Sequence, residues 1–135
     1  KAGISVSDQP LGNDLLCFLN HPKTSEIATS EQTTRSAAQV SLWKDVLADS
    51  IVVIGNAPTA LFRLIEEIQA GGPKPALVIG FPVGFVGARE SKKLLNEFQP
   101  LIPHVTLLGR LGGSAMAASA LNALAQLALK QVTDD

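Results

Sequence analysis

The second half of the chain repeats one pattern three times: a short apolar run, a glycine-rich turn, and a stretch with helical periodicity. The apolar runs cover residues 51–55, 76–80 and 104–108. A strand buried in a parallel sheet is a continuous apolar run rather than an alternating one. The repeat therefore predicts an α/β fold in which all three turns lie at one edge of the sheet, where open α/β sheets bind ligands.

The helical stretches have recognisable boundaries. The first has Pro58 near its first turn and is stopped by Gly71, Gly72 and Pro73. Its apolar face, opposite its charged residues, is made of Ala60, Leu61, Leu64, Ile65 and Ile68. The second is expected over residues 88–98. The third, capped by Ser114, is apolar nearly all round over 115–128, which implies burial on several sides, before a frayed polar tail at 131–135.

The pattern before the repeat is weaker. It predicts a short strand over residues 4–6, a buried strand over 15–19, and a helix over 33–47 that Thr33 or Thr34 caps. Val40, Trp43 and Leu47 would share one face of that helix. The single cysteine, Cys17, would be an ordinary core residue of the second strand.

Composition narrows the class of protein. A length of 135 residues predicts a single α/β domain over 1–135, and a hydrophobic fraction of 46% is ample for a core. Charged residues make up only 17%, which suggests extra buried surface between subunits. A net charge of -1 argues against general affinity for nucleic acid or membrane. A lone cysteine fits a cytoplasmic protein, and no apolar run is long enough to cross a bilayer.

The turns carry the candidate chemistry. Their glycines fit neither the dinucleotide nor the P-loop spacing, so a nucleotide-binding domain is a minor alternative. Bare backbone at helix N-termini attracts negative charge, and Arg35 and Arg110 can grip carboxylates. For each of these arginines a structural salt bridge or a solvated charge is an equal alternative, whereas Arg63 and Arg89 are expected to be solvated. His21 and His104 lack metal-ligand spacing and are expected to be structural or solvated. The pattern favours a large apolar polyanion as ligand.

Four segments together resemble the precorrin-8X methylmutase family. They are Thr34-Arg35-Ser36-Ala37-Ala38, residues 54–61 from Ile54-Gly55-Asn56, residues 80–92 with Gly80-Phe81-Pro82-Val83-Gly84 and Glu90-Ser91-Lys92, and residues 109–116 from Gly109-Arg110-Leu111-Gly112-Gly113-Ser114. The resemblance runs from about Leu11 to Leu127. It implies a three-layer, Rossmann-like α/β sandwich with a mainly parallel sheet, of which this chain is the C-terminal portion.

The same resemblance implies a function. Family members move a methyl group from C11 to C12 of precorrin-8X or cobalt-precorrin-8, giving hydrogenobyrinate or cobyrinate in vitamin B12 biosynthesis. They act as homodimers and need no cofactor or metal for this intramolecular step. Arg35 is expected to bind a substrate carboxylate. The expected substrate-binding residues are Thr34, Arg35, Asn56, Thr59, Val83, Gly84, Arg110, Gly112, Gly113 and Ser114.

One departure from the family leaves an alternative open. The family's proton-donating histidine lies in a Val-His-Ala-Thr/Cys-Gly-like motif, and nothing in the printed sequence matches it. The chain therefore has no expected catalytic residue of its own and is expected to be inactive alone. The alternative is a non-catalytic tetrapyrrole-binding module.

Overall fold

Three parallel strands form one sheet in the computed structural model, which describes residues 14–99 and 101–134. The strands are β1 (Ile51–Ile54), β2 (Leu77–Gly80) and β3 (His104–Thr106), in the order β1-β2-β3. Val78 is the register partner of Val52 in β1 and of His104 in β3. The parallel sheet predicted from the three apolar runs is confirmed, and the turns after the strands lie at its carboxyl edge.

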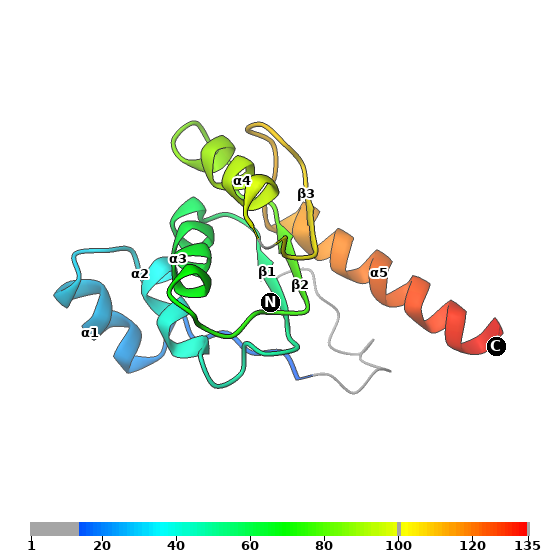
Figure 1. Cartoon of the computed structure of the whole chain (residues 1–135), viewed down its shortest axis with the longest axis horizontal. Coiled ribbons are helices and arrows are strands. Elements are labelled where there is room, and N and C mark those ends of the chain that lie inside the picture. The colour runs from blue at the N-terminus through cyan, green and yellow to red at the C-terminus, as the bar shows by residue number, and fades with distance from the viewer. Residues whose placement is uncertain (1–13, 100, 135) are drawn as a thin grey trace.

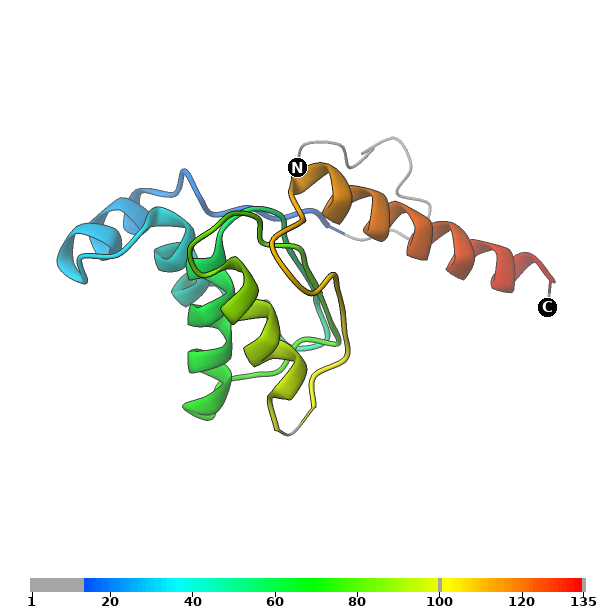
Figure 2. The same ribbon diagram turned by 90° about the horizontal axis from the view of Figure 1, so that it is seen from above.

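Helices cover both faces of this sheet. The crossover helices α3 (Pro58–Gln69) and α4 (Ala88–Glu97) lie on one face, and α5 (Ser114–Asp134) lies on the other (Figures 1 and 2). Two short elements, α2 (Arg35–Ala38) and the 3-10 helix η2 (Gln39–Trp43), pack against α3. The three-layer α/β arrangement is therefore present in the described part of the chain.

The core divides into two clusters, because successive strand residues point to opposite faces. Val52, Ile54 and Val78 pack with the helices α3 and α4, whereas Val53, Ile79 and Val105 pack with α5. The predicted apolar face of α3 is fully confirmed, since Ala60, Leu61, Leu64, Ile65 and Ile68 are all buried. Full burial of each of the leucine and isoleucine side chains contributes about 2 kcal/mol.

The predicted strand over residues 15–19 is wrong. Residues 14–18 have no regular secondary structure, Leu16 is 57% exposed, and Cys17 is exposed rather than buried. An apolar run becomes a strand only where a neighbouring strand offers hydrogen bonds, and the described sheet offers none to this segment. The predicted strand over 4–6 lies outside the described residues.

The next segment contains a helix that the apolar pattern did not reveal. Helix α1 (Pro22–Ser30) begins directly after His21, whose ring Nδ1 accepts a hydrogen bond of 3.1 Å from the Lys23 amide. Proline suits this first helical position because its missing N–H needs no partner there. The helix buries only Thr24, so it lacks the apolar face by which helices are predicted.

The predicted helix over 33–47 is interrupted. It is divided into α2, η2 and a turn, although Val40 and Leu47 are buried and Trp43 packs against the same cluster as predicted. Residues three apart share a face in a 3-10 helix as well as in an α-helix, so periodicity did not separate the two.

The last two elements also differ from prediction at their ends. Strand β3 ends at Thr106, two residues earlier than predicted. Ser114 is the first residue of α5 rather than its cap, and the helix continues to Asp134 instead of fraying. Helix α5 packs on β1 and β2 with one side, while Leu127 is 60% exposed, so burial on several sides is not observed in the described chain.

Candidate ligand-binding site at the carboxyl edge of the sheet

The three turns after the strands contact one another directly. The Val83 amide donates to the Asn56 carbonyl at 3.3 Å and joins the second turn to the first. The Gly113 amide donates to the Phe81 carbonyl at 2.8 Å and joins the third turn to the second. We call the surface formed by residues 55–59, 81–87 and 107–114 the carboxyl edge. It brings together eight of the ten predicted site residues.

Glycine allows two of these contacts to be close. A Cβ atom on Gly112 would overlap the carbonyl oxygen of Phe81 and lie 2.7 Å from that of Pro82. A Cβ atom on Gly55 would lie 2.7 Å from the Cα of Ser114, at the start of α5. Both positions therefore require glycine for close backbone packing.

Other glycines leave bare backbone facing open space. Gly84 and Gly113 have φ angles of 127° and 117°, and a Cβ atom on either would meet nothing within 4 Å. Glycine adopts these angles readily, whereas other residues rarely do. Gly109, with a φ angle of 102°, is open in the same way, so a ligand can approach the main chain closely at three points of the carboxyl edge.

The surface beside this bare backbone is apolar. Phe85 is 84% exposed and Val86 is 91% exposed, and four further apolar side chains at the edge are also exposed: Val83, Leu107, Leu108 and Leu111. The Arg110 guanidinium lies 5.2 Å from the centroid of the Phe85 ring, a cation–π arrangement. An exposed apolar patch of this kind marks an interaction site. Here it combines apolar contact area with a cation.

The two predicted residues before the repeat lie beside the first turn. The hydroxyls of Thr34 and Thr59 are 2.8 Å apart, and Thr59 is in the first turn of α3. Thr34 Oγ1 also accepts from the Ala37 amide at 3.1 Å, which confirms the predicted cap. Arg35 follows directly and is exposed. Thr34 and Thr59 are thus brought together, and Arg35 stands next to them.

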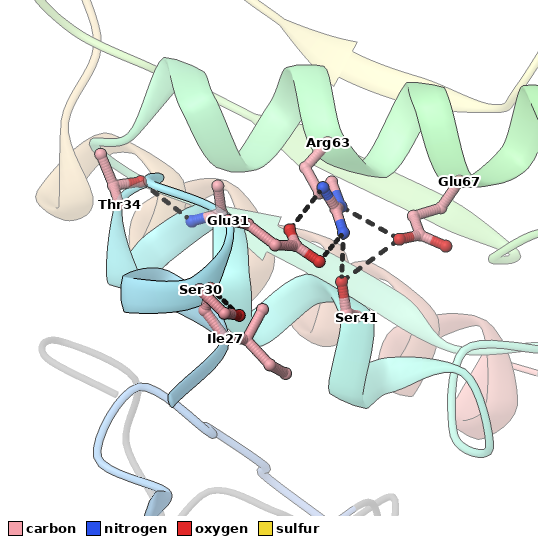
Figure 3. Close-up of polar contacts among 8 residues, drawn as sticks. Ile27, Ser30, Glu31, Thr34, Ser41, Arg63 and Glu67 are labelled. Atoms are coloured by element: carbon pink, nitrogen blue, oxygen red, sulfur yellow. Dashed lines mark hydrogen bonds and ion pairs between the residues drawn. The ribbon is translucent and has the colours of Figure 1, made fainter. Parts of the chain in front are cut away.

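A polar network holds this segment against α3, and it corrects the expectation that Arg63 is solvated. Arg63 forms ion pairs of 3.0 Å with both Glu31 and Glu67, and its Nη2 donates to Ser41 at 2.8 Å (Figure 3). Burial lowers the pKa of Arg63, but the hydrogen bonds and charges of both glutamates outweigh it, so the pKa is raised. Glu31 follows α1 and Ser41 is in η2. The network therefore fixes both ends of the segment that carries Thr34 and Arg35.

Lys92 is a residue of this region to which sequence reasoning gave no role. Its side chain is fully buried, and Nζ donates to the Gly109 carbonyl at 3.1 Å and to the Leu111 carbonyl. Desolvation by burial lowers the pKa of this amine. The signal was present in the sequence, because Lys92 shares helical spacing with Ala88, Ser91 and Leu95, which are all buried.

The remaining histidine, His104, forms contacts with residues near it in the chain. His104 Nδ1 lies 2.6 Å from the Ile102 carbonyl, and its other ring nitrogen lies 3.3 Å from Asn96 Oδ1.

Residues 14–99 and 101–134 contain no group of three histidine, cysteine, aspartate or glutamate side chains that could hold a metal ion. None of the helices in the same ranges is long and apolar enough to span a membrane.

Fold and edge together define an α/β domain with an open, apolar, arginine-bearing surface at the carboxyl ends of parallel strands. Comparison with known proteins identifies the family. A sequence model of precorrin-8X methylmutase matches residues 1–127, so the chain belongs to the precorrin-8X methylmutase family.

Individual relatives agree with this assignment. The chain is 53% identical over 123 residues to the precorrin-8X methylmutase of Pseudomonas aeruginosa, covering 91% of this chain and 59% of the relative. It is 43% identical over 124 residues to the cobalt-precorrin-8 methylmutase of Methanocaldococcus jannaschii, covering 92% and 55% respectively. A crystal structure of the precorrin-8X methylmutase of Thermus thermophilus matches with a TM-score of 0.83 at 39% identity, covering 96% of this chain and 62% of that chain. The chain thus spans about three fifths of the length of the relatives it matches.

Proposed function

We propose that this chain forms the tetrapyrrole-binding part of an isomerase of cobalamin biosynthesis. The reaction would move a methyl group from C11 to C12 of precorrin-8X or cobalt-precorrin-8, giving hydrogenobyrinate or cobyrinate. The observation that carries the proposal is the convergence of three turns into one surface that combines bare backbone, exposed apolar side chains and Arg110. Family membership supports it.

The chemistry of the carboxyl edge suits such a substrate. A corrin precursor has a broad apolar ring with acetate and propionate groups around its rim. Phe85, Val86 and Leu111 would contact the ring, while Arg110 and Arg35 would bind carboxylates as charge-assisted hydrogen-bond donors. The first turns of α3 and α5 add amides that favour negative charge. Asn56, Thr59 and Ser114 stand where polar contacts to the rim would form.

We assign binding and orientation to this chain, and no proton transfer. A methyl shift within one molecule needs the substrate held in a reactive conformation and a proton donor to the macrocycle. The turns supply the first requirement. The printed sequence lacks the histidine motif that the family resemblance implies for the second. We further propose a homodimer, which the low charged fraction of 17% and the exposed apolar residues of α5 support. We also propose a cytoplasmic location, which the single cysteine fits.

Binding of hydrogenobyrinate to the full-length protein, measured by isothermal titration calorimetry, tests the proposal. Arg35→Ala is expected to weaken binding about tenfold or more, because a charge-assisted pair is worth about 1.5–3 kcal/mol. Arg89→Ala is the matched control, since Arg89 is an exposed arginine in α4. Failure of the full-length protein both to bind hydrogenobyrinate and to isomerise precorrin-8X would contradict the proposal.

A second candidate is a tetrapyrrole-binding module without catalytic activity, since the carboxyl edge supports binding and we assign none of its residues a proton transfer. The two candidates differ in turnover. The isomerase converts precorrin-8X to hydrogenobyrinate, which absorbance spectra would follow, whereas the module binds hydrogenobyrinate with no conversion at any enzyme concentration.

A further inference from the structure

A buried lysine supports the turn that carries Arg110. Lys92 lies on the inner side of α4 with 0% of its surface exposed, and its ammonium group donates to the carbonyls of Gly109 and Leu111. These two residues flank Arg110 in the chain. Lys92 therefore spans the main chain on both sides of the arginine.

The carbonyl between them is also occupied. The Gly84 amide donates to the Arg110 carbonyl at 3.2 Å. Three successive carbonyls of the third turn thus accept hydrogen bonds from the body of the protein. This arrangement satisfies the acceptors of the turn and leaves the Arg110 side chain exposed, over the Phe85 ring.

Burying the charge of Lys92 costs free energy, so packing alone does not explain why a lysine occupies this position. Taking an ammonium group out of water is expensive, and apolar replacements of buried charges are often neutral or stabilising. Within residues 14–99 and 101–134, Lys92 makes no ion pair with a carboxylate. Its compensation there comes from the two carbonyl dipoles.

We propose that Lys92 is a positioning residue for ligand binding, which fixes the third turn so that Arg110 can reach a ligand carboxylate. The inference rests on the proposed tetrapyrrole site. It assigns Lys92 no contact with the ligand, since its donors are directed at main-chain carbonyls. Its effect on affinity would then pass through Arg110.

A double-mutant cycle on the full-length protein separates this role from a general structural one. Lys92→Met removes the charge and both donors at similar length, and it is expected to weaken hydrogenobyrinate binding about tenfold. In an Arg110→Ala background the same substitution is expected to change affinity less than twofold, because residues that act through one another are not additive. Lys93→Met is the matched control, since Lys93 is the next residue of α4 and is exposed with an ion pair to Glu97.

The outcomes are distinguishable. Equal losses for Lys92→Met in both backgrounds would overturn the positioning role. Absence of hydrogenobyrinate binding by the wild-type protein would instead contradict the proposed function. If Lys92→Met does not fold, nitrogen-15 NMR of the lysine ammonium groups carries the test. The Lys92 signal should shift on ligand addition to wild type and shift less in Arg110→Ala, and a signal that saturating ligand leaves unmoved would overturn the inference.

Discussion

The packing of the third turn against the second can be tested by a single methyl group. Gly112→Ala places a Cβ atom in steric overlap with the Phe81 carbonyl oxygen and 2.7 Å from the Pro82 carbonyl oxygen. Both obstacles are backbone atoms, which cannot rotate aside as the end of a side chain can. The two turns must therefore move apart, and the 2.8 Å hydrogen bond from Gly113 to Phe81 is the first contact at risk.

The expected cost follows from two terms. Forcing an extra carbon into a packed site costs about 1–3 kcal/mol. Loss of one hydrogen bond adds about 1 kcal/mol. We therefore expect Gly112→Ala to lower the free energy of unfolding by about 2–4 kcal/mol, a large part of the roughly 5–15 kcal/mol of an ordinary domain. Affinity for hydrogenobyrinate should fall as well, because the separated turns carry Gly84 on one side and Arg110 on the other.

Urea unfolding followed by circular dichroism measures the first effect, and calorimetric titration measures the second. The control is Gly71→Ala, away from the edge, where φ is 91° and a Cβ atom would meet nothing within 4 Å. It should cost about 1 kcal/mol through backbone strain and leave affinity unchanged. Wild-type stability and affinity in Gly112→Ala would refute the close contact between the turns.

Three further predictions follow from the described contacts. Arg63→Ala should lower the free energy of unfolding by about 1–2 kcal/mol, discounted for the partial exposure of its ion pairs, whereas exposed Arg89→Ala should change it by less than about 0.5 kcal/mol; equal effects would contradict the network. The buried Thr106 hydroxyl has no hydrogen-bond partner among the described residues, so Thr106→Val should raise the free energy of unfolding by about 1 kcal/mol, and a loss would reveal a partner. Because burial lowers the pKa of Lys92, its ammonium group loses a proton at a lower pH in the folded protein than in the unfolded chain. The free energy of unfolding of wild type relative to Lys92→Met should therefore rise as pH increases through the folded pKa toward 10.5, and a pH-independent difference would contradict the shift.

The parallel sheet was predictable because its signal is local. A buried strand must be apolar along its whole length, and a tight crossover needs glycine or proline beside a helix start, so both appear in the sequence. The segments at 15–19 and 22–30 were not predictable for the opposite reason. An apolar run there lacks a neighbouring strand, and the helix α1 buries only Thr24.

The residues of the candidate site likewise fall into those with a local signal in the sequence and those that only the fold brings together. The glycines and Arg110 could be proposed because they lie in the turns themselves. The contact of Thr34 with Thr59 joins residues 25 positions apart and required the fold. Arg63 was misassigned because the two carboxylates that neutralise it include Glu31. Only the packing of α1 on α2, and of α2 on α3, brings Glu31 near.

The distribution of charge partners separates the arginine that holds the fold from the cations that we assign to the ligand. Arg63, in α3, has two carboxylates and a hydroxyl around it. In the described part of the chain, Arg35 and Arg110 form no ion pair with any carboxylate. An arginine that only stabilises the fold gains most when its charge is neutralised within the protein, as that of Arg63 is. Cations left without carboxylates beside bare backbone keep a positive potential at the carboxyl edge, and a polycarboxylate arriving there would supply the partners that the protein withholds.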